Sequence, residues 1–195
     1  MSLFSSYDVP MTVRLTLLGT GTPTPLRHRG GSSFLVRHLD HVLLFDCGPG
    51  TVRRLLECGV SPPEVDTLFL THLHYDHCVD YGHLVLCRWD QGAGQVPDLS
   101  VYGPSPTATM TDRLFGSDGV FDPDLCARTE HPLSQCVYES RGGKLPRQRP
   151  RPSVTEVTGE AEVHGHGWHV RSLEVVHAQR FLCCLAYRLE IGGRT

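Results

Sequence analysis

Short apolar segments separated by glycine and proline turns recur along the chain. Apolar residues either alternate with polar ones or run on without interruption, as in half-buried and fully buried β-strands. The run VDTLFL (residues 65–70) is typical, because β-branched and aromatic side chains follow the Pro62-Pro63 breaker. We predict strands at Val13–Leu18, Ser33–Arg37, Val42–Phe45, Val65–Leu70, Leu99–Tyr102, Val154–Thr158, Val170–Val176 and Cys183–Leu189.

Helical patterns lie between these strands, and we predict helices at Val52–Cys58, Tyr81–Trp89 and Pro106–Phe115. The last has readable ends, because Ser105 can cap it, Pro106 suits the first helical position and Gly116 can terminate it. The helix before it is expected to start near Asp80. Strands interspersed with packed helices predict an α/β or α+β protein, and periodicity alone does not choose between these layouts.

Composition predicts one globular domain spanning residues 1–195, because a chain with 39% hydrophobic residues can bury a core of useful size. There is no apolar run of about 18 residues, and MSLFSSYDVPMTVR lacks the apolar region of a signal peptide, so we expect no membrane association. The 8 cysteines have no framework spacing and no CxxC pair. We interpret them as reduced thiols. Because free thiols are typical of reducing compartments, we expect a cytoplasmic protein.

The segment FLTHLHYDHC (residues 69–78) places His72, His74, Asp76 and His77 directly after a predicted buried strand. In extended backbone His72 and His74 point to the same side, so both imidazoles can reach one ion. Asp76 and His77 then face a neighbouring point. Imidazole and carboxylate together suit zinc, with manganese or iron as substitutes, whereas calcium and magnesium prefer oxygen alone. Chance clustering among 12 histidines is the alternative.

The spacing favours two ions, because a single ion does not easily take four donors from one short segment. A two-metal site holds a bridging water whose pKa falls to about 7, and it clamps the oxygens of a phosphoryl or carbonyl centre under attack. The cluster therefore predicts a metal-dependent hydrolase.

The run THLHYDH resembles the His-x-His-x-Asp-His signature of the metallo-β-lactamase superfamily. Three other segments follow the order of that superfamily: LTLLGTGTPTP (15–25), LLFDCGPGT (43–51) and LEVVHAQRFLCCLAYRLE (173–190). The last is similar to the ribonuclease Z branch, in which a histidine ends one strand and an aromatic-Arg pair lies in the next. The resemblance implies an α/β fold, the αββα four-layer sandwich.

The resemblance also implies a ligand set. His72, His74 and His177 would bind a first zinc, Asp76 and His77 a second, and Asp76 or a downstream histidine would handle protons. From the residues alone, His177 could instead cap the sheet, since it ends an alternating strand. Asp46 is expected to be structural, beneath the site. The histidines of HGHGWH (164–169) are expected to form an exposed hairpin rather than a metal site.

The family carries a bridging aspartate and a final histidine downstream of the Tyr-Arg strand, whereas this sequence ends at EIGGRT (190–195). We therefore expect the N-terminal two-thirds of an enzyme domain, with its C-terminal part missing, whether as a fragment or as a natural short form. Such a chain should bind zinc weakly and have little or no activity.

One basic segment stands apart in composition: RGGKLPRQRPRP (141–152) has five basic residues, three prolines and no acidic residue. Its prolines exclude a helix or a central strand. It is either a solvated loop or a basic arm that touches RNA phosphates without reading sequence. The candidate RNA contacts are Arg141, Lys144, Arg147, Arg149 and Arg151, with Arg27 and Arg29 in PTPLRHRGGSS. Ribonuclease Z enzymes carry a Pro-Lys-Arg-Asn-like loop at that second place, which this sequence does not match.

These observations predict a ribonuclease Z-like phosphodiesterase, with precursor-tRNA 3′ trailers as a candidate substrate. Two alternatives stay open. A hydrolase of the same fold could act on small esters, lactones, sulfates or cyclic phosphodiesters, and an inactive truncated chain could serve as a binding partner. The expected partners are RNA or a small phosphodiester and, by resemblance, a second copy in a homodimer.

Overall fold

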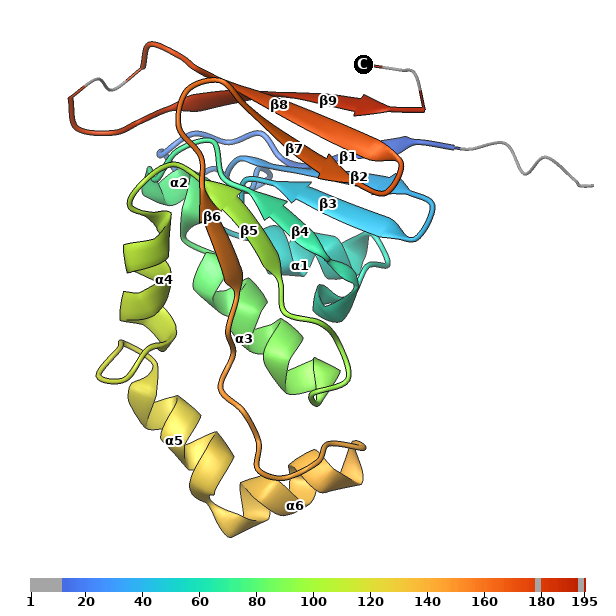
Figure 1. The fold of residues 1–195 in the computed structure, drawn as a ribbon, viewed down its shortest axis with the longest axis vertical. Helices are drawn as coiled ribbons and strands as arrows, with labels where there is room; N and C mark the ends of the chain where they lie inside the picture. The colour runs from blue at the N-terminus through green and yellow to red at the C-terminus, as the bar shows by residue number, and fades with distance from the viewer. Residues whose placement is uncertain (1–11, 178–179, 193–194) are drawn as a thin grey trace, which may run out of the picture.

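The computed structural model describes residues 12–177, 180–192 and 195. Strands at its centre form one mixed sheet in the order of the sequence (Figure 1). The first three strands pair antiparallel, and the third to the sixth pair parallel. They are β1 (Arg14–Gly19), β2 (Ser33–His38), β3 (His41–Phe45), β4 (Thr67–Phe69), β5 (Ser100–Gly103) and β6 (Ser153–Glu156).

A smaller antiparallel sheet lies against the first one and consists of β7 (Ala161–Gly165), β8 (Trp168–Glu174) and β9 (Leu185–Ile191). All predicted strands are confirmed in the two sheets, with ends that shift by one or two residues. Sequence reasoning missed β7. None of its residues is fully buried, so its apolar pattern is weak.

The middle strands of the central sheet, β3 to β5, are covered on both faces, which explains their near-continuous apolar sequences. On one face Leu44, Leu68 and Val101 belong to the main core, together with side chains of the covering helices. These helices are α1 (Thr51–Glu57), α3 (Tyr81–Gly92) and α4 (Thr107–Phe115). On the other face Leu43 and Phe69 belong to a second cluster with residues of β8 and β9.

Aromatic rings join the two sheets. Phe69 stacks on Phe45 and Tyr102, its register partners on the neighbouring strands, at centroid distances of 4.9 and 5.1 Å. Trp168 and Tyr187 meet Phe69 edge-on at 5.9 and 5.3 Å. Edge-to-face and offset-stacked pairs add to the free energy of apolar burial. This cluster fixes β8 and β9 over β4, the strand that leads into the histidine segment.

The helices differ from the prediction in two ways. Residue Pro106 precedes α4 as its N-cap with no side-chain cap bond, so the predicted Ser105 cap was wrong; the φ and ψ of Pro106 are not helical. Four elements were not predicted: α2 (Tyr75–Cys78), the 3₁₀ turn η1 (Pro62–Glu64), α5 (Asp122–Glu130) and α6 (Pro132–Ser140). The last two each bury a single residue, so they carry little amphipathic signal.

The outcome is an α/β sandwich of three layers in the described residues: helices, the central sheet and the smaller sheet (Figure 1). Helices α5 and α6 extend beyond the sheets. The basic segment 141–152 contains no helix or strand and returns from α6 past α3 to β6. No helix in the described part of the chain has both the length and the apolar character that crossing a bilayer requires.

Candidate metal centre

Three histidines from two sheets meet at one point. His72 and His74 follow β4, and His177 follows β8. Their ring centroids lie 4.7 to 5.3 Å apart, and His72 Nε2 lies 2.9 Å from His74 Nδ1. One nitrogen of each lies within 4.8 Å of the others, so all three can reach a single ion.

Two further predicted residues flank this point. His77 lies on α2 with its ring centroid 4.0 Å from that of His72, and its Nε2 is 3.6 Å from Asp76 Oδ2. The carboxylate of Asp76 is buried, and its Oδ1 has no hydrogen-bond partner among the described residues. An unpaired carboxylate oxygen in a buried position is costly unless something binds it.

The carboxylate of Asp46 anchors the site from below. Its Oδ2 lies 2.6 Å from His77 Nδ1, and its Oδ1 accepts hydrogen bonds from the amide and the hydroxyl of Thr71. The Thr71 hydroxyl also lies 2.9 Å from His72 Nδ1. Because that hydroxyl donates to Asp46, it accepts from His72 Nδ1–H. In the neutral form of each of these two imidazoles, Nε2 is therefore the nitrogen that carries the lone pair.

Two glycines allow the loops to close around α2. A Cβ on Gly31 or Gly48 would overlap the carbonyl oxygen of Asp76. That carbonyl instead accepts from the amide of Ser32 at 3.1 Å, and the carbonyl of His77 accepts from the amide of Cys47 at 2.6 Å. The glycines at positions 31 and 48 therefore let the backbone of these two loops approach α2 closely, and the resulting hydrogen bonds position Asp76 and His77.

Burial and neighbouring charges shift the pKa values of two histidines in opposite directions. Burial, followed by the neighbouring His77, lowers the pKa of His72 to about 4. Burial also acts to lower the pKa of His77, but the hydrogen bond and charge of Asp46, with the charge of Asp76, outweigh it and raise that pKa. His72 is therefore neutral, with a free lone pair, over the whole physiological range.

The donor set fits a divalent transition metal on three observations: three converging imidazole nitrogens, the unpaired buried Oδ1 of Asp76, and the fixed tautomers of His72 and His77. Sequence reasoning placed Asp46 beneath the site but missed Thr71. The only available signal for Thr71 was its position directly before His72.

Most basic residues of segment 141–152 have partners inside the molecule. Arg141 and Arg147 both contact Asp90, at 3.1 and 2.8 Å, and Arg149 contacts Asp122 at 2.6 Å. The guanidinium of Arg147 lies 3.8 Å from the ring centroid of Trp89, and its side chain is only 4% exposed. These pairs hold the segment against α3 and α5, and an RNA role for these three arginines stays a prediction.

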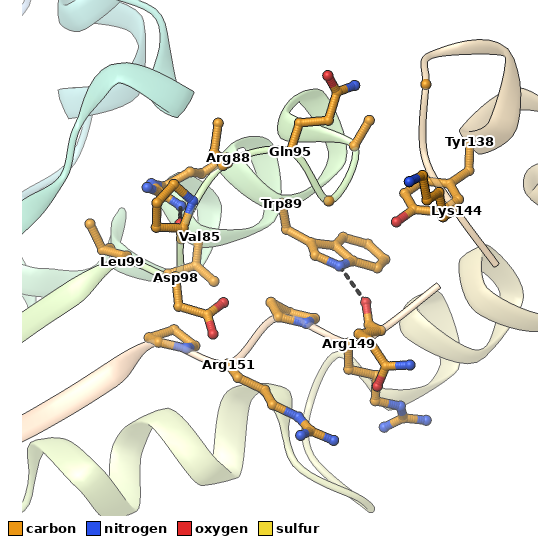
Figure 2. A pocket seen from close by; sticks show the side chains of 18 of the residues that line it. Val85, Arg88, Trp89, Gln95, Asp98, Leu99, Tyr138, Lys144, Arg149 and Arg151 are labelled. Atoms are coloured by element: carbon orange, nitrogen blue, oxygen red, sulfur yellow. Dashed lines mark hydrogen bonds between the residues drawn. The ribbon is translucent and has the colours of Figure 1, made fainter. Parts of the chain in front are cut away.

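The other two basic residues of segment 141–152 can still contact a ligand. Lys144 and Arg151 have no ion pair among the described residues, and both line a cavity of about 630 Å³ between α3, α6 and segment 141–152 (Figure 2). The indole of Trp89 also lines it and donates to the carbonyl of Gln148. The cavity shares no residue with the histidine cluster. Arg27 and Arg29 are exposed on the loop between β1 and β2.

A family profile described as the metallo-β-lactamase superfamily matches residues 26–175. The chain is 44% identical to ribonuclease Z of Mycobacterium sp. (strain KMS) over 123 residues, which cover 59% of this chain and 43% of that protein. It is 38% identical to ribonuclease Z of Mycolicibacterium gilvum (strain PYR-GCK) over 120 residues, or 61% of this chain and 41% of that protein. The matches thus span about two-fifths of the length of these relatives.

Solved structures agree on the fold. The short form of human tRNase Z superposes with a TM-score of 0.64 at 20% identity, covering 93% of this chain and 66% of that one. The metallo-β-lactamase fold protein YhfI from Bacillus subtilis gives 0.63 at 17% identity, covering 91% and 58%. At these identities the likeness concerns the fold alone.

Proposed function

The chain belongs to the metallo-β-lactamase superfamily, and we propose that it carries the zinc site of a ribonuclease Z-like phosphodiesterase. The superfamily implies a divalent metal; zinc is the part that we propose, because three imidazole nitrogens with a carboxylate suit it best. The observation that carries the proposal is the meeting of His72, His74 and His177, in a chain about 40% identical to ribonuclease Z over its matched part.

We assign His72, His74 and His177 to a first ion, and Asp76 and His77 to a second. Metal ions bound here would lower the pKa of a water ligand to about 7 and neutralise charge on the phosphoryl oxygens. The chain itself orients the ligands: Asp46 holds His77 by Nδ1, and Thr71 holds His72 by the same nitrogen. Asp76 Oδ1 is buried without a hydrogen-bond partner among the described residues, and it would accept a proton from the attacking water.

The donor count sets an expectation for the strength of binding. Among the described residues, the proposed site of the first ion has three ligands and that of the second ion has only two. We therefore expect weak binding of zinc, with at most one ion held at the first site, and little or no hydrolysis by this polypeptide. The inactive-chain hypothesis predicts no hydrolysis at all.

Substrate and partners are part of the proposal. An RNA backbone would lie near the histidine cluster, with Arg27 and Arg29 at one side, and would be attracted by Lys144 and Arg151. Precursor tRNA with a 3′ trailer is the substrate that the relatives suggest. The homodimer and the cytoplasmic location are likewise proposals, tested by light scattering and by cell fractionation.

The test compares zinc-loaded protein on bis-p-nitrophenyl phosphate, on p-nitrophenyl acetate and on a lactone. We expect slow hydrolysis of the phosphodiester that exceeds hydrolysis of the other two, and its loss in Asp76→Asn. Asp124→Asn is the matched control, because that exposed carboxylate contacts only Arg128 on α5. Preference for the ester or lactone would refute the phosphodiesterase assignment.

A further inference from the structure

We propose a second metal site on the β7–β8 hairpin, formed by Glu162, His164 and His169. A ligand atom of each lies within 4.8 Å of the other two. His164 and His169 are cross-strand partners in the register of β7 and β8, and Glu162 lies two residues before His164 on the same strand face. The hairpin predicted for HGHGWH is therefore present, but its histidines converge with a carboxylate.

Distances favour a metal over a simple hydrogen-bonded cluster. His164 Nε2 and His169 Nε2 lie 3.5 and 3.6 Å from the same oxygen, Glu162 Oε2. Such separations exceed N–H···O hydrogen bonds, which run to about 3.2 Å. They match the separation of about 3.3–3.6 Å between two ligands of a tetrahedral zinc with bonds of about 2.0–2.2 Å.

Two further features of the hairpin agree. The imidazoles of His164 and His169 lie on the same face of the hairpin, with ring centroids 4.1 Å apart. The Nε2 of His169 is buried and has no hydrogen-bond partner among the described residues. A buried ring nitrogen that lies beside a carboxylate oxygen without a hydrogen bond is an arrangement that a cation would complete.

Neighbouring charged residues orient the three proposed ligands. Arg171 contacts Oε1 of Glu162 at 3.2 Å, which leaves Oε2 for the histidines. Glu190, the register partner of His169 on β9, faces its Nδ1 at 3.9 Å. A carboxylate on the far side of a ligating imidazole orients the ring and raises its basicity. With two nitrogens and one oxygen, the site suits Zn²⁺, Ni²⁺ or Cu²⁺ and not Ca²⁺ or Mg²⁺.

This site is separate from the histidine cluster. Trp168 and Val170 of β8 are buried against the central sheet, so His169 between them points to the opposite face. From His169 to the end of β8 at Glu174 is about 17 Å, at about 3.3 Å per residue, and His177 lies beyond that end. The inference therefore does not depend on the proposed function.

The experiment is titration of the whole chain with Zn²⁺ in a His72→Ala/His74→Ala background, which removes two of the three ligands of the first ion in the histidine cluster. We expect about one equivalent to bind, and to be lost when His164→Ala or Glu162→Gln is added. Both side chains are more than half exposed, so these changes leave the core intact. His166→Ala, in the turn of the same hairpin, is the control and should retain the ion.

Three results would overturn the site: no binding in the His72→Ala/His74→Ala background, binding that survives Glu162→Gln and His164→Ala, or equal loss in His166→Ala. If the double background fails to fold, the same changes are made in the unmodified chain. There the zinc content should fall by about one equivalent in Glu162→Gln and not in His166→Ala. An unchanged content in Glu162→Gln would contradict the proposal.

Discussion

Asp46 Oδ2 lies 2.6 Å from His77 Nδ1, and this contact links the loop after β3 to the histidine segment after β4. Asp46 is buried and has a positive φ of 60°, an uncommon conformation for a residue other than glycine. The turn is held by its bonds to Thr71 and Ser32 as well as to His77. A single carboxylate therefore sets both the position and the tautomer of a proposed metal ligand.

Replacing this carboxylate should weaken metal binding without removing a ligand. We expect Asp46→Asn to reduce zinc affinity by about 10- to 100-fold. The asparagine amide is uncharged, so it accepts the hydrogen bond from His77 Nδ1–H more weakly and supports the ring less well as a metal ligand. Competition with a zinc-chelating dye measures the affinity. Asp66→Asn is the control, since Asp66 bonds to His41 and the amide of Val42, away from the cluster. Equal loss in both variants would show a general effect on folding.

Zinc binding should release a proton from His77. Its raised pKa means that the ring keeps its proton to a higher pH than an ordinary imidazole, and a metal at Nε2 must displace that proton. The pKa of His72 is about 4, so this ring releases none above about pH 5. Calorimetry in buffers of different ionisation enthalpy should show release that declines as pH rises and disappears in His77→Ala. Release that persists in His77→Ala would assign the proton to another group.

Acid should destabilise the metal-free chain through His72. Its pKa is about 4 in the folded chain and near the ordinary value of about 6.5 when unfolded. Between these values the unfolded state binds more protons, so the free energy of unfolding falls as pH drops from about 6.5 to 4. The raised pKa of His77 acts in the opposite sense, because its stabilisation is lost as pH rises. Urea unfolding should show a flatter decline in His72→Asn, and an unchanged slope would contradict the role of His72.

Arg147 should contribute to stability. Its guanidinium lies between the rings of Trp89 and Tyr138 and pairs with Asp90. Arg147→Ala should lower the free energy of unfolding by about 2 kcal/mol, from the lost cation–π contacts and a weakened ion pair. Lys144→Ala, in the same segment and without a partner among the described residues, should change stability by less than about 0.5 kcal/mol. Equal effects would mean that the segment is not held by Arg147.

RNA affinity should depend on the unpaired cations. We expect Lys144→Ala/Arg151→Ala to weaken binding to a precursor tRNA and to reduce the slope of log affinity against log salt by about 2. Fluorescence anisotropy at several salt concentrations gives that slope. Arg53→Ala is the control, because Arg53 is exposed on α1 and pairs with Glu57. A slope that does not change would remove segment 141–152 from the proposed RNA surface.

The sequence predicted β3, β4 and β5 because they are apolar on both faces, and it predicted the histidine segment because four candidate ligands, three histidines and one aspartate, stand together. It could not show from periodicity that His177 meets His72, since more than a hundred residues separate them; only the resemblance indicated it. The contacts of Asp90 with Arg141 and Arg147 join residues 51 and 57 positions apart and leave no local pattern. The same is true of Glu190 beside His169.

Anomalous X-ray diffraction at the zinc absorption edge, from crystals of the chain grown with Zn²⁺, is the direct test of the proposed metal centre. We expect a peak within bonding distance of His72, His74 and His177, with zinc–nitrogen distances of about 2.0–2.1 Å. A peak at the β7–β8 hairpin alone, or none within reach of those three histidines, would contradict the proposed metal centre.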